Sequence, residues 1–387
     1  MQLMSFRKAR LLATAFLCLA VPLSACGTGA PSEDAPAQAS GSLTIDDDIA
    51  AGKARLDRLM APLITGDIGG ETRALLVMHR GRIVAEYYAP GYNRDTRLLG
   101  WSMSKTVTAV LIGMLITDGR LELDAPVHIP AWSSPGDPRR AITLRHMLHM
   151  AAGLDHVEAV GPESKKAVYS GDTTRMLFLD GAGDMARYAT GHMLTDPPGK
   201  RFNYSSATSV ILSDIIARTL TPSTDPALRR DAVLTYARGR LFDPVGLGSM
   251  TPEFDAAGTM IGGSMIHATA RDWAKFGEFL RNNGAVEGAQ IIPGGWVRFM
   301  KEPSPANAAY GGHIWRNVPR TDGDPSPVLF PDLAPANVFA LQGHYGQYVI
   351  VSPSQRLTVV RLGMTEGEDR PALTRQLGQI VAAFPGE

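Results

Sequence analysis

Cysteine is almost absent from this sequence. The 387 residues contain 2 cysteines, Cys18 and Cys26, both near the amino terminus. A chain with so few thiols cannot be held together by a network of disulfide bonds. At this length it can instead bury a large core, and its folding must depend on core packing.

The sequence also lacks an excess of charge of either sign. Lys plus Arg number 38 and Asp plus Glu number 38, which gives a formal net charge of 0. This balance offers no basic surface for DNA or RNA, so no nucleic-acid partner is expected. Phosphate-binding glycine loops, internal repeats and a Gly-x-Ser-x-Gly elbow are absent as well, and the last absence argues against an α/β-hydrolase.

The first residues have the layout of an export signal. Arg7, Lys8 and Arg10 precede the apolar run 11–23, which leads into Ser24-Ala25-Cys26. Leu23-Ser24-Ala25-Cys26 resembles the lipobox of a bacterial lipoprotein. That resemblance implies that 1–25 is a signal peptide and that Cys26 becomes the acylated first residue, leaving no free thiol. The alternative is a conventional signal peptide that is cut nearby.

Residues 26–44 are rich in Ala, Pro, Ser and Gly, which predicts a flexible tether. The protein is therefore expected to be an exported bacterial cell-envelope lipoprotein on the periplasmic side of a membrane, anchored by a lipid on Cys26. The central apolar run 107–116 is too short to cross a bilayer. The sequence does not determine the oligomeric state.

Residues 45–387 are predicted to form one α/β (α+β) domain, an antiparallel sheet flanked by helices plus an all-helical lobe. Two β-hairpins are expected, at 74–88 and at 347–362, and together they build a sheet that joins the two ends of the chain. Helices are expected at 45–63, 264–282 and 371–384, and a nearly all-apolar central helix follows Ser102 and ends at Gly119. The α/β body covers about 45–128 and 255–387, and the lobe covers about 129–254.

The start of the central helix carries a candidate nucleophile. Ser102 and Lys105 lie one helical turn apart, so the lysine amine could remove the serine proton. A lysine acts as a base only when burial and a positive helix end lower its pKa. The alternative is that Ser102 only caps the helix and that Lys105 extends to solvent.

Two later segments could join this pair. Tyr204-Ser205-Ser206 opens a helical run, and a phenol there could share protons with the serine and the lysine. Without the other motifs, Tyr204 would be interpreted as a surface tyrosine on a loop. Gly343-His344-Tyr345-Gly346-Gln347 precedes the second hairpin, where glycines leave an amide N–H free to face an oxyanion.

Together these motifs resemble the penicillin-recognising serine hydrolases, in the branch of class C β-lactamases, D-alanyl-D-alanine peptidases, family VIII esterases and 6-aminohexanoate-dimer hydrolases. Ser-x-x-Lys lies at Ser102, Tyr-x-Ser at Tyr204 and His-x-Gly at His344, in the order of that family. The resemblance implies the β-lactamase/transpeptidase-like fold. It also implies a Ser102 nucleophile, with Lys105 and Tyr204 sharing the general-base and proton-return roles.

The resemblance further implies an oxyanion hole made of the backbone N–H groups of Ser102 and Gln347, and it implies no metal or cofactor. The β-lactamases and transpeptidases of this family usually carry asparagine where this chain has Ser206. The third motif has His344 in place of the usual lysine, and the bulky Tyr345 stands where threonine is common. These departures favour the esterase and 6-aminohexanoate-dimer branch. Tyr169 either forms part of the pocket wall or only packs. His146 and His149 are expected to be structural, because no third ligand follows at a metal-site spacing.

The predicted activity is hydrolysis of a small ester or amide through an acyl-serine intermediate. The alternatives are a D-alanyl-D-alanine carboxypeptidase or β-lactamase, and a non-catalytic envelope lipoprotein that binds muropeptides or a partner protein.

Overall fold

The computed structural model describes residues 41–158 and 170–386, which belong to one compact unit, Ala39–Glu387. The helices are α1 (Lys53–Thr65), α2 (Ser104–Thr117), α3 (Leu144–Leu148), α5 (Asp172–Phe178), α6 (Met185–Thr190), α7 (Ser206–Leu220), α8 (Pro226–Ala237), α9 (Asp243–Val245), α10 (Ala270–Arg281), α11 (Gly294–Lys301) and α12 (Arg370–Ala382). The strands are β1 (Ser42–Ile45), β2 (Glu71–His79), β3 (Arg82–Tyr88), β4 (Leu98–Leu99), β5 (Thr251–Pro252), β6 (Ile266–Ala268), β7 (Ala285–Val286), β8 (Ala289–Gln290), β9 (Trp315–Arg316), β10 (Phe339–Gly343), β11 (Gln347–Ser352) and β12 (Leu357–Met364).

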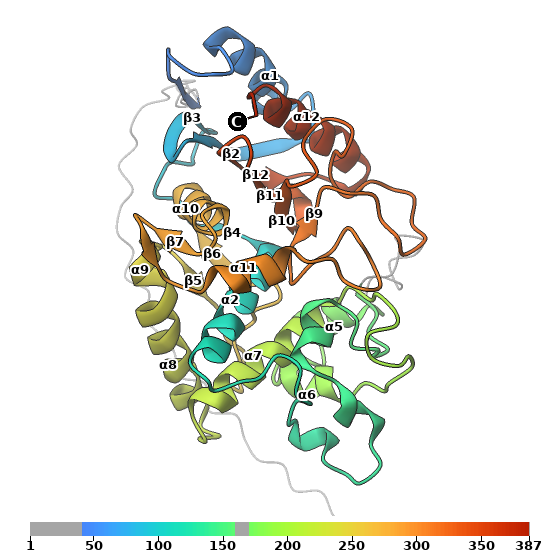
Figure 1. The fold of residues 1–387 in the computed structure, drawn as a ribbon. Coiled ribbons are helices and arrows are strands. Elements are labelled where there is room, and N and C mark those ends of the chain that lie inside the picture. The colour runs from blue at the N-terminus through green and yellow to red at the C-terminus, as the bar shows by residue number, and fades with distance from the viewer. Residues whose placement is uncertain (1–40, 159–169, 387) are drawn as a thin grey trace, which may run out of the picture. The chain divides into compact units, whose positions relative to one another are not determined.

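A 7-stranded antiparallel sheet has the order β1-β3-β2-β12-β11-β10-β9. Both predicted hairpins are confirmed, as β2 with β3 and as β11 with β12. The two hairpins meet where β2 pairs with β12, with Leu76 opposite Val360. The sheet therefore joins the two ends of the chain, as expected (Figure 1).

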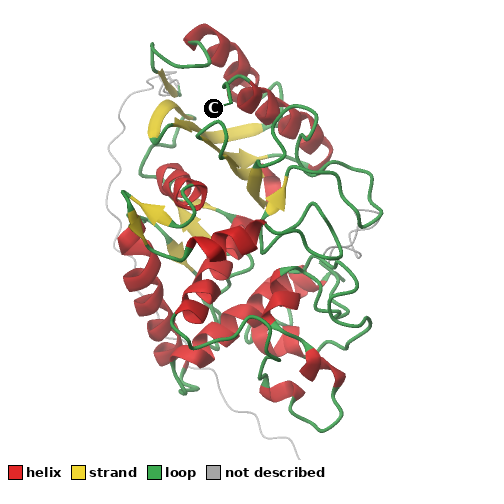
Figure 2. Cartoon of the chain, viewed as in Figure 1, coloured by secondary structure: helices red, strands yellow, loops and turns green. Residues whose placement is uncertain are grey.

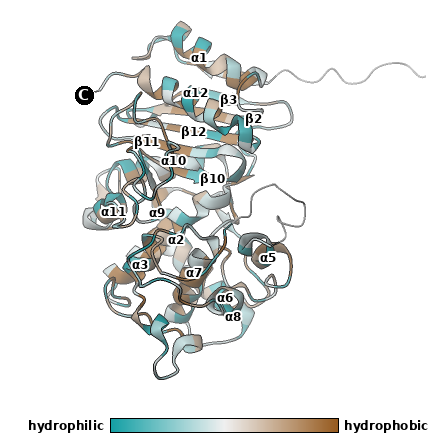
Figure 3. Cartoon of the chain, turned by 90° about the vertical axis from the view of Figure 1, so that its right-hand side faces the viewer, coloured by the Kyte–Doolittle hydropathy of each residue, from teal (hydrophilic) through white to brown (hydrophobic). Residues whose placement is uncertain are grey.

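The strands bury both faces, and alternate residues enter different cores. Leu75 and Val77 pack with α1 and α12, whereas Leu76 belongs to the core that contains α10 and α2. This division follows from the two-residue period of a strand. Figure 3 shows the sheet between α1 and α12 on one side and α10 on the other. Gly277 allows α10 to lie close to the sheet, since a Cβ there would come within 2.7 Å of Thr358 Cγ2.

Helix α2 is buried from Ser104 to Leu115, which confirms the predicted central helix. It ends at Thr117, Asp118 is its C-cap, and Gly119 follows with φ 70°. At Gly113 a Cβ would lie 2.2 Å from the indole of Trp296, so only glycine lets α11 pack this closely on α2. The described helices α3 and α5 to α9 all fall within 129–254, the range predicted to be helical, and α5, α6 and α7 lie together in the lower part of Figure 2.

Two predicted helix boundaries were wrong. The helix expected over 264–282 begins only at Ala270, because Ile266–Ala268 pairs with β4 and β5 and the Thr269 side chain caps α10. The helix expected over 45–63 begins at Lys53, after Gly52 with φ 75°. Ser42–Ile45 instead forms β1 and pairs with β3, so the tether predicted over 26–44 ends before Ser42. No helix within 41–158 and 170–386 combines the length and the hydropathy needed to span a bilayer.

Candidate active site

Ser102 lies in a short 3₁₀ turn, Trp101–Met103, that leads directly into α2. The Ser102 side chain caps no backbone N–H, so the capping alternative is wrong. Trp101 holds a positive φ of 49°, and this bend turns the chain just before the serine. Ser102 is partly exposed, whereas the helix behind it is buried.

Lys105 is buried, with 1% of its surface exposed, and it does not extend to solvent. Its Nζ lies 2.9 Å from Ser102 Oγ, 2.8 Å from Ser206 Oγ and 2.8 Å from the carbonyl O of Gly263. An ammonium group has three hydrogens, and each has an acceptor here. Burial lowers the pKa of Lys105 to about 8, and the nearby negative charge of Glu158 opposes this shift. Near pH 8 Lys105 is therefore partly a neutral amine.

Tyr204 packs beside this amine and is partly buried. Lys105 Nζ lies 4.8 Å from the centroid of its ring, and the ring stacks on Trp315 at 5.5 Å. Burial raises the pKa of Tyr204 well above its usual value, and a hydrogen bond with Ser102 opposes that rise. Tyr204 is therefore a protonated phenol beside the serine, and the surface-tyrosine alternative is wrong.

The third motif forms the turn between β10 and β11, which the sequence placed only before a hairpin. Tyr345 and Gly346 both have positive φ, 57° and 72°. The Gln347 side chain holds this turn, donating to the carbonyl O of His344 at 2.9 Å and to that of Gly363 at 2.7 Å. Arg361, which is fully buried, donates to the carbonyl O of Gly346 at 3.0 Å.

The Ser-x-x-Lys motif and the His-x-Gly motif come into contact through two glycines, Gly100 and Gly343, and through the indole of Trp101. A Cβ on Gly343 would lie 2.3 Å from the carbonyl O of Gly100, so only glycine permits this approach. The Trp101 ring then lies 5.3 Å from His344 and 6.0 Å from Tyr345, centroid to centroid. The turn at 344–346 is therefore fixed next to Ser102.

These segments surround a cleft of about 1060 Å³. The predicted residues that line it are Ser102, Tyr204, Ser206, His344 and Tyr345. Lys105 and Gln347 are buried beside these residues, and so is Gly346. Tyr169 and Cys26 lie outside the described residues.

Sequence reasoning missed several residues here. Glu158 lines the cleft, and its Oε1 accepts from Ser206 Oγ at 2.6 Å. Arg370, at the first turn of α12, lines the cleft from the opposite part of the fold. Buried His313 contacts the backbone carbonyl O of Lys105 through Nδ1 at 3.0 Å, and its own carbonyl accepts from Thr106 Oγ1 at 2.7 Å. No sequence motif marks any of these positions.

His146 and His149 have structural surroundings, as expected. His146 completes a capping box with Thr143 at the start of α3. His149 is buried and stacks on Phe299. Among the described residues, no three or more His, Cys, Asp or Glu side chains form a group that could hold a metal ion.

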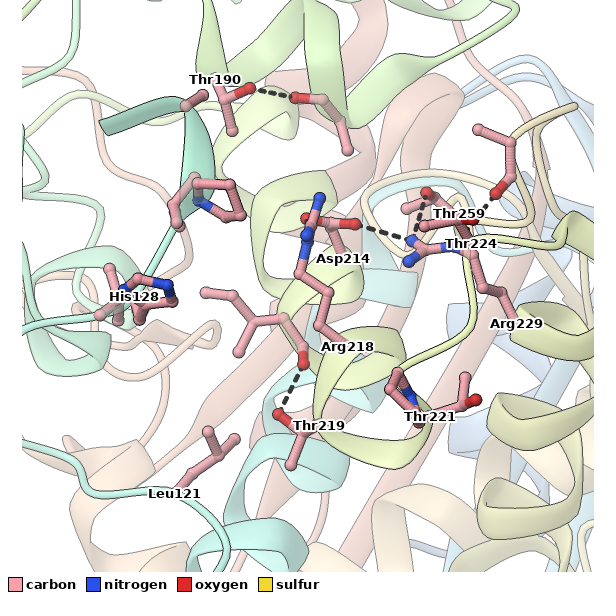
Figure 4. A pocket seen from close by; sticks show the side chains of 18 of the residues that line it. Leu121, His128, Thr190, Asp214, Arg218, Thr219, Thr221, Thr224, Arg229 and Thr259 are labelled. Carbon is pink, nitrogen blue, oxygen red and sulfur yellow. Dashed lines mark hydrogen bonds and ion pairs between the residues drawn. The ribbon is translucent and has the colours of Figure 1, made fainter. Parts of the chain in front are cut away.

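A second cavity, of about 960 Å³, lies among α6, α7 and the segment around His128. None of the predicted site residues lines it. Asp214 of α7 accepts from Arg218 at 2.6 Å and from Arg229 at 2.7 Å, and Figure 4 shows both guanidinium groups beside it. Because neither Ser102 nor Tyr204 lines this cavity, it is not a candidate for the chemistry at Ser102.

Comparison with known proteins identifies the family and the fold of the chain. The protein-family model for beta-lactamase matches residues 56–382. A 6-aminohexanoate-dimer hydrolase from Paenarthrobacter ureafaciens is 28% identical over 229 residues, which cover 58% of this chain and 56% of that protein. The chain thus matches little more than half the length of that relative.

Two solved structures show the same fold. A penicillin-binding protein homologue from Caulobacter crescentus has a TM-score of 0.58 at 18% identity, covering 88% of this chain and 99% of the other. A family VIII carboxylesterase has a TM-score of 0.57 at 15% identity, covering 84% and 95%. The β-lactamase/transpeptidase-like fold predicted from the motifs is therefore confirmed.

The buried histidines predict a loss of stability in acid. Burial lowers the pKa of His149 and of His156 to about 4 and that of His313 to about 3, below the unfolded value near 6.5. The unfolded chain therefore takes up protons first, and stability is complete above about pH 6.5 and falls toward the folded pKa values. Each such histidine lowers the free energy of unfolding by about 2 kcal/mol at pH 5.

Urea unfolding at pH 7.5 and pH 5 measures this loss. The two ring nitrogens of His149 have no hydrogen-bond partner among the described residues, so His149→Met removes a titrating group without breaking a side-chain hydrogen bond. We expect the variant to lose less stability between the two pH values than the wild type. An equal loss in both proteins would contradict the assignment for His149.

Proposed function

The chain belongs to the beta-lactamase family, and on this premise we propose that it is a serine hydrolase that cleaves an ester or amide bond through an acyl intermediate on Ser102. The observation that carries the proposal is the buried amine of Lys105, 2.9 Å from Ser102 Oγ. Among the alternatives, a binding lipoprotein has no need for such a pair, because burying a lysine costs free energy.

In the first step Ser102 Oγ attacks the substrate carbonyl while the neutral amine of Lys105 takes its proton. The raised pKa of Tyr204 disfavours a phenolate, which makes Lys105 the better first base. The negative charge that develops on the carbonyl oxygen would be stabilised by the backbone N–H groups of Ser102 and Gln347.

Collapse of this intermediate breaks the bond to the leaving alcohol or amine, which takes a proton from Tyr204, and the ammonium of Lys105 replaces that proton. A water molecule then attacks the acyl-Ser102 ester by the reverse proton path and releases the acid. Apart from this water molecule and the substrate, the steps use only residues of the chain.

For the substrate we propose a small ester or linear amide, as for a carboxylesterase or small-amide hydrolase. Trp101, Phe178 and Trp315 give the cleft apolar walls, and its volume of about 1060 Å³ suits a small molecule. The relative from Paenarthrobacter ureafaciens is named for hydrolysis of an amide dimer, which supports this choice.

Arg370 favours substrates that carry a carboxylate. It lines the cleft, is only partly buried, and makes no ion pair with any described residue. A guanidinium group left without a partner in a cleft can bind a carboxylate. This cation also keeps the second candidate open, a D-alanyl-D-alanine carboxypeptidase or β-lactamase, since those substrates end in a carboxylate.

The acyl-enzyme route is tested by intact-protein mass spectrometry of residues 42–387 mixed with p-nitrophenyl esters, a cephalosporin and a linear amide dimer. We expect turnover or an adduct that is absent in Ser102→Ala. The value of kcat/KM should fall about tenfold per pH unit below a pKa of about 8, because protonation removes the lone pair of Lys105. Turnover that persists in Ser102→Ala would contradict the proposal.

Arg370→Ala should raise KM for a carboxylate-bearing amide by about tenfold and leave KM for a neutral p-nitrophenyl ester unchanged. Arg375→Ala is the matched control, because Arg375 lies on the same helix, lines the same cleft and already pairs with Asp332. Equal changes for both substrates would show that Arg370 does not recognise the carboxylate.

We also propose that the protein is a lipoprotein of the bacterial cell envelope, anchored through Cys26 on the periplasmic side. The lipobox-like Leu23-Ser24-Ala25-Cys26 supports this assignment, and so does the composition of 27–41, the part of the predicted tether that precedes β1. In a bacterial host, Cys26→Ser should release the protein from the membrane fraction or leave it unprocessed, as judged by fractionation and mass. An unchanged membrane fraction would contradict the anchor.

A further inference from the structure

The amine of Lys105 has one ambiguous partner besides Ser102. The carbonyl O of Gly263 can only accept a hydrogen bond, whereas the hydroxyl of Ser206 can donate or accept. A neutral amine keeps two N–H groups and has one lone pair. If Ser206 donated into that lone pair, Ser102 could no longer pass its proton to Lys105.

Glu158 removes this ambiguity. Ser206 Oγ donates its single proton to Glu158 Oε1 at 2.6 Å, and the backbone N–H of Ser206 donates to Oε2 at 2.5 Å. A carboxylate can only accept, so Ser206 Oγ is left with lone pairs alone on the side of Lys105. The 2.8 Å contact from Lys105 Nζ to Ser206 Oγ is then necessarily an N–H donated by the lysine.

We propose that Glu158 is a positioning residue that acts through Ser206 to aim the lone pair of Lys105 at Ser102. The two N–H groups of the neutral amine point to Ser206 and Gly263, the two positions that can only accept. The lone pair therefore faces Ser102 Oγ, 2.9 Å away. This role rests on the proposed function, in which Lys105 is the base.

Glu158 is held in place by the segment that carries the second motif. Asn203 Nδ2 donates to the carbonyl O of Leu154 at 3.1 Å and to that of His156 at 2.9 Å, and Ser205 Oγ contacts His156 Nδ1 at 3.0 Å. The residues that flank Tyr204 thus bind the segment 154–157, which leads to Glu158.

The start of α5 holds the other side of the same segment. The backbone N–H of Val157 donates to Asp172 Oδ2 at 2.6 Å, and Thr173 Oγ1 donates to Glu158 Oε2 at 2.8 Å. With Ser206 and Thr173 both donating to it, the carboxylate has a fixed orientation. Its contact with Ser206 therefore belongs to a network of hydrogen bonds that fixes the carboxylate.

The charge of Glu158 has a separate effect on Lys105. It raises the pKa of Lys105 against the larger effect of burial, so removing the charge lowers that pKa. The other titratable groups beside Lys105 are Tyr204, whose ring faces Nζ at 4.8 Å, and His313, which contacts the Lys105 carbonyl. Farther from Lys105, the charge of Glu158 also acts on His344 and Tyr310, and the charge of Arg370 acts on Tyr204 and His344.

Two consequences of losing Glu158 can therefore be separated. Loss of the acceptor frees the Ser206 proton and lowers the rate at every pH, and this effect requires Ser206. Loss of the charge moves the acid limb of the pH profile to lower pH, and this effect does not require Ser206. A merely structural role would lower the rate by the same factor whether or not Ser206 is present.

The experiment measures the rate constant for labelling of Ser102 by a fluorophosphonate between pH 5 and pH 9, in the full chain. The variants are Glu158→Leu, Glu158→Gln, Ser206→Ala and the double variant Glu158→Leu with Ser206→Ala. Glu253→Gln is the matched control, since Glu253 is exposed, pairs with His267 and lies outside the cleft. Thermal unfolding checks that each variant is folded.

We expect Glu158→Leu to lower the plateau rate constant by about tenfold and to move the acid limb to lower pH. Glu158→Gln should move the limb in the same direction with a smaller plateau loss, because one amide oxygen replaces two oxygens that serve Ser206. In the Ser206→Ala background, Glu158→Leu should change the plateau by no more than about twofold while the limb still moves. Glu253→Gln should match the wild type.

The proposal is overturned if Glu158→Leu leaves the plateau rate constant unchanged. It is also overturned if the fold-decrease in the double variant equals the product of the fold-decreases in the two single variants, because the two residues would then act independently. A plateau loss with an unmoved acid limb also overturns it, because Glu158 would then carry no charge and would not be limited to accepting hydrogen bonds. Absence of labelling in the wild type contradicts the proposed function itself, and is distinguished from these outcomes because they all start from a labelled wild type.

Discussion

The structure of the site depends on one buried amine and its three acceptors. Lys105 Nζ is bound by Ser102 at the start of its own helix, by Ser206 in the helical lobe and by Gly263 in the α/β body. A buried ammonium group without such partners would be costly, so these three segments must converge for the fold to be stable. The same burial lowers the pKa of Lys105 to about 8 and thereby makes it useful as a base.

Glycine at the meeting points permits this convergence. A Cβ on Gly263 would lie 2.8 Å from the carbonyl O of Ser206, and one on Gly262 would lie 2.3 Å from Thr108 Oγ1 of α2. At the other side of Ser102, Gly343 permits the approach of β10 to Gly100. Helix α2 lies at the centre of these contacts, between the sheet and the lobe (Figure 1).

Much of this arrangement follows from local sequence patterns. Hairpins and the apolar helix α2 have periodicities that identify them, and Ser102, Lys105 and Tyr204 lie in short motifs whose order is informative. Glu158 and Arg370 have no such pattern, because their importance comes only from partners distant in the sequence. The 3₁₀ turn at Ser102 was missed for a related reason: the positive φ of Trp101 is stabilised by tertiary contacts with His344 and Tyr345, which local propensity does not contain.

Serine at position 206 requires a neighbouring residue that sets the direction of its hydrogen bond with Lys105. An asparagine would present its amide oxygen to Lys105 as an acceptor without help. The hydroxyl of Ser206 can act either way, so its direction has to be set by a neighbour, and the neighbour is Glu158. Glu158 in turn is positioned by Thr173 at the start of α5, and the backbone leading to it by Asn203 beside Tyr204. The hydrogen bonds of the lobe around residues 154–158 therefore bear on the chemistry at Ser102, although none of them touches the nucleophile.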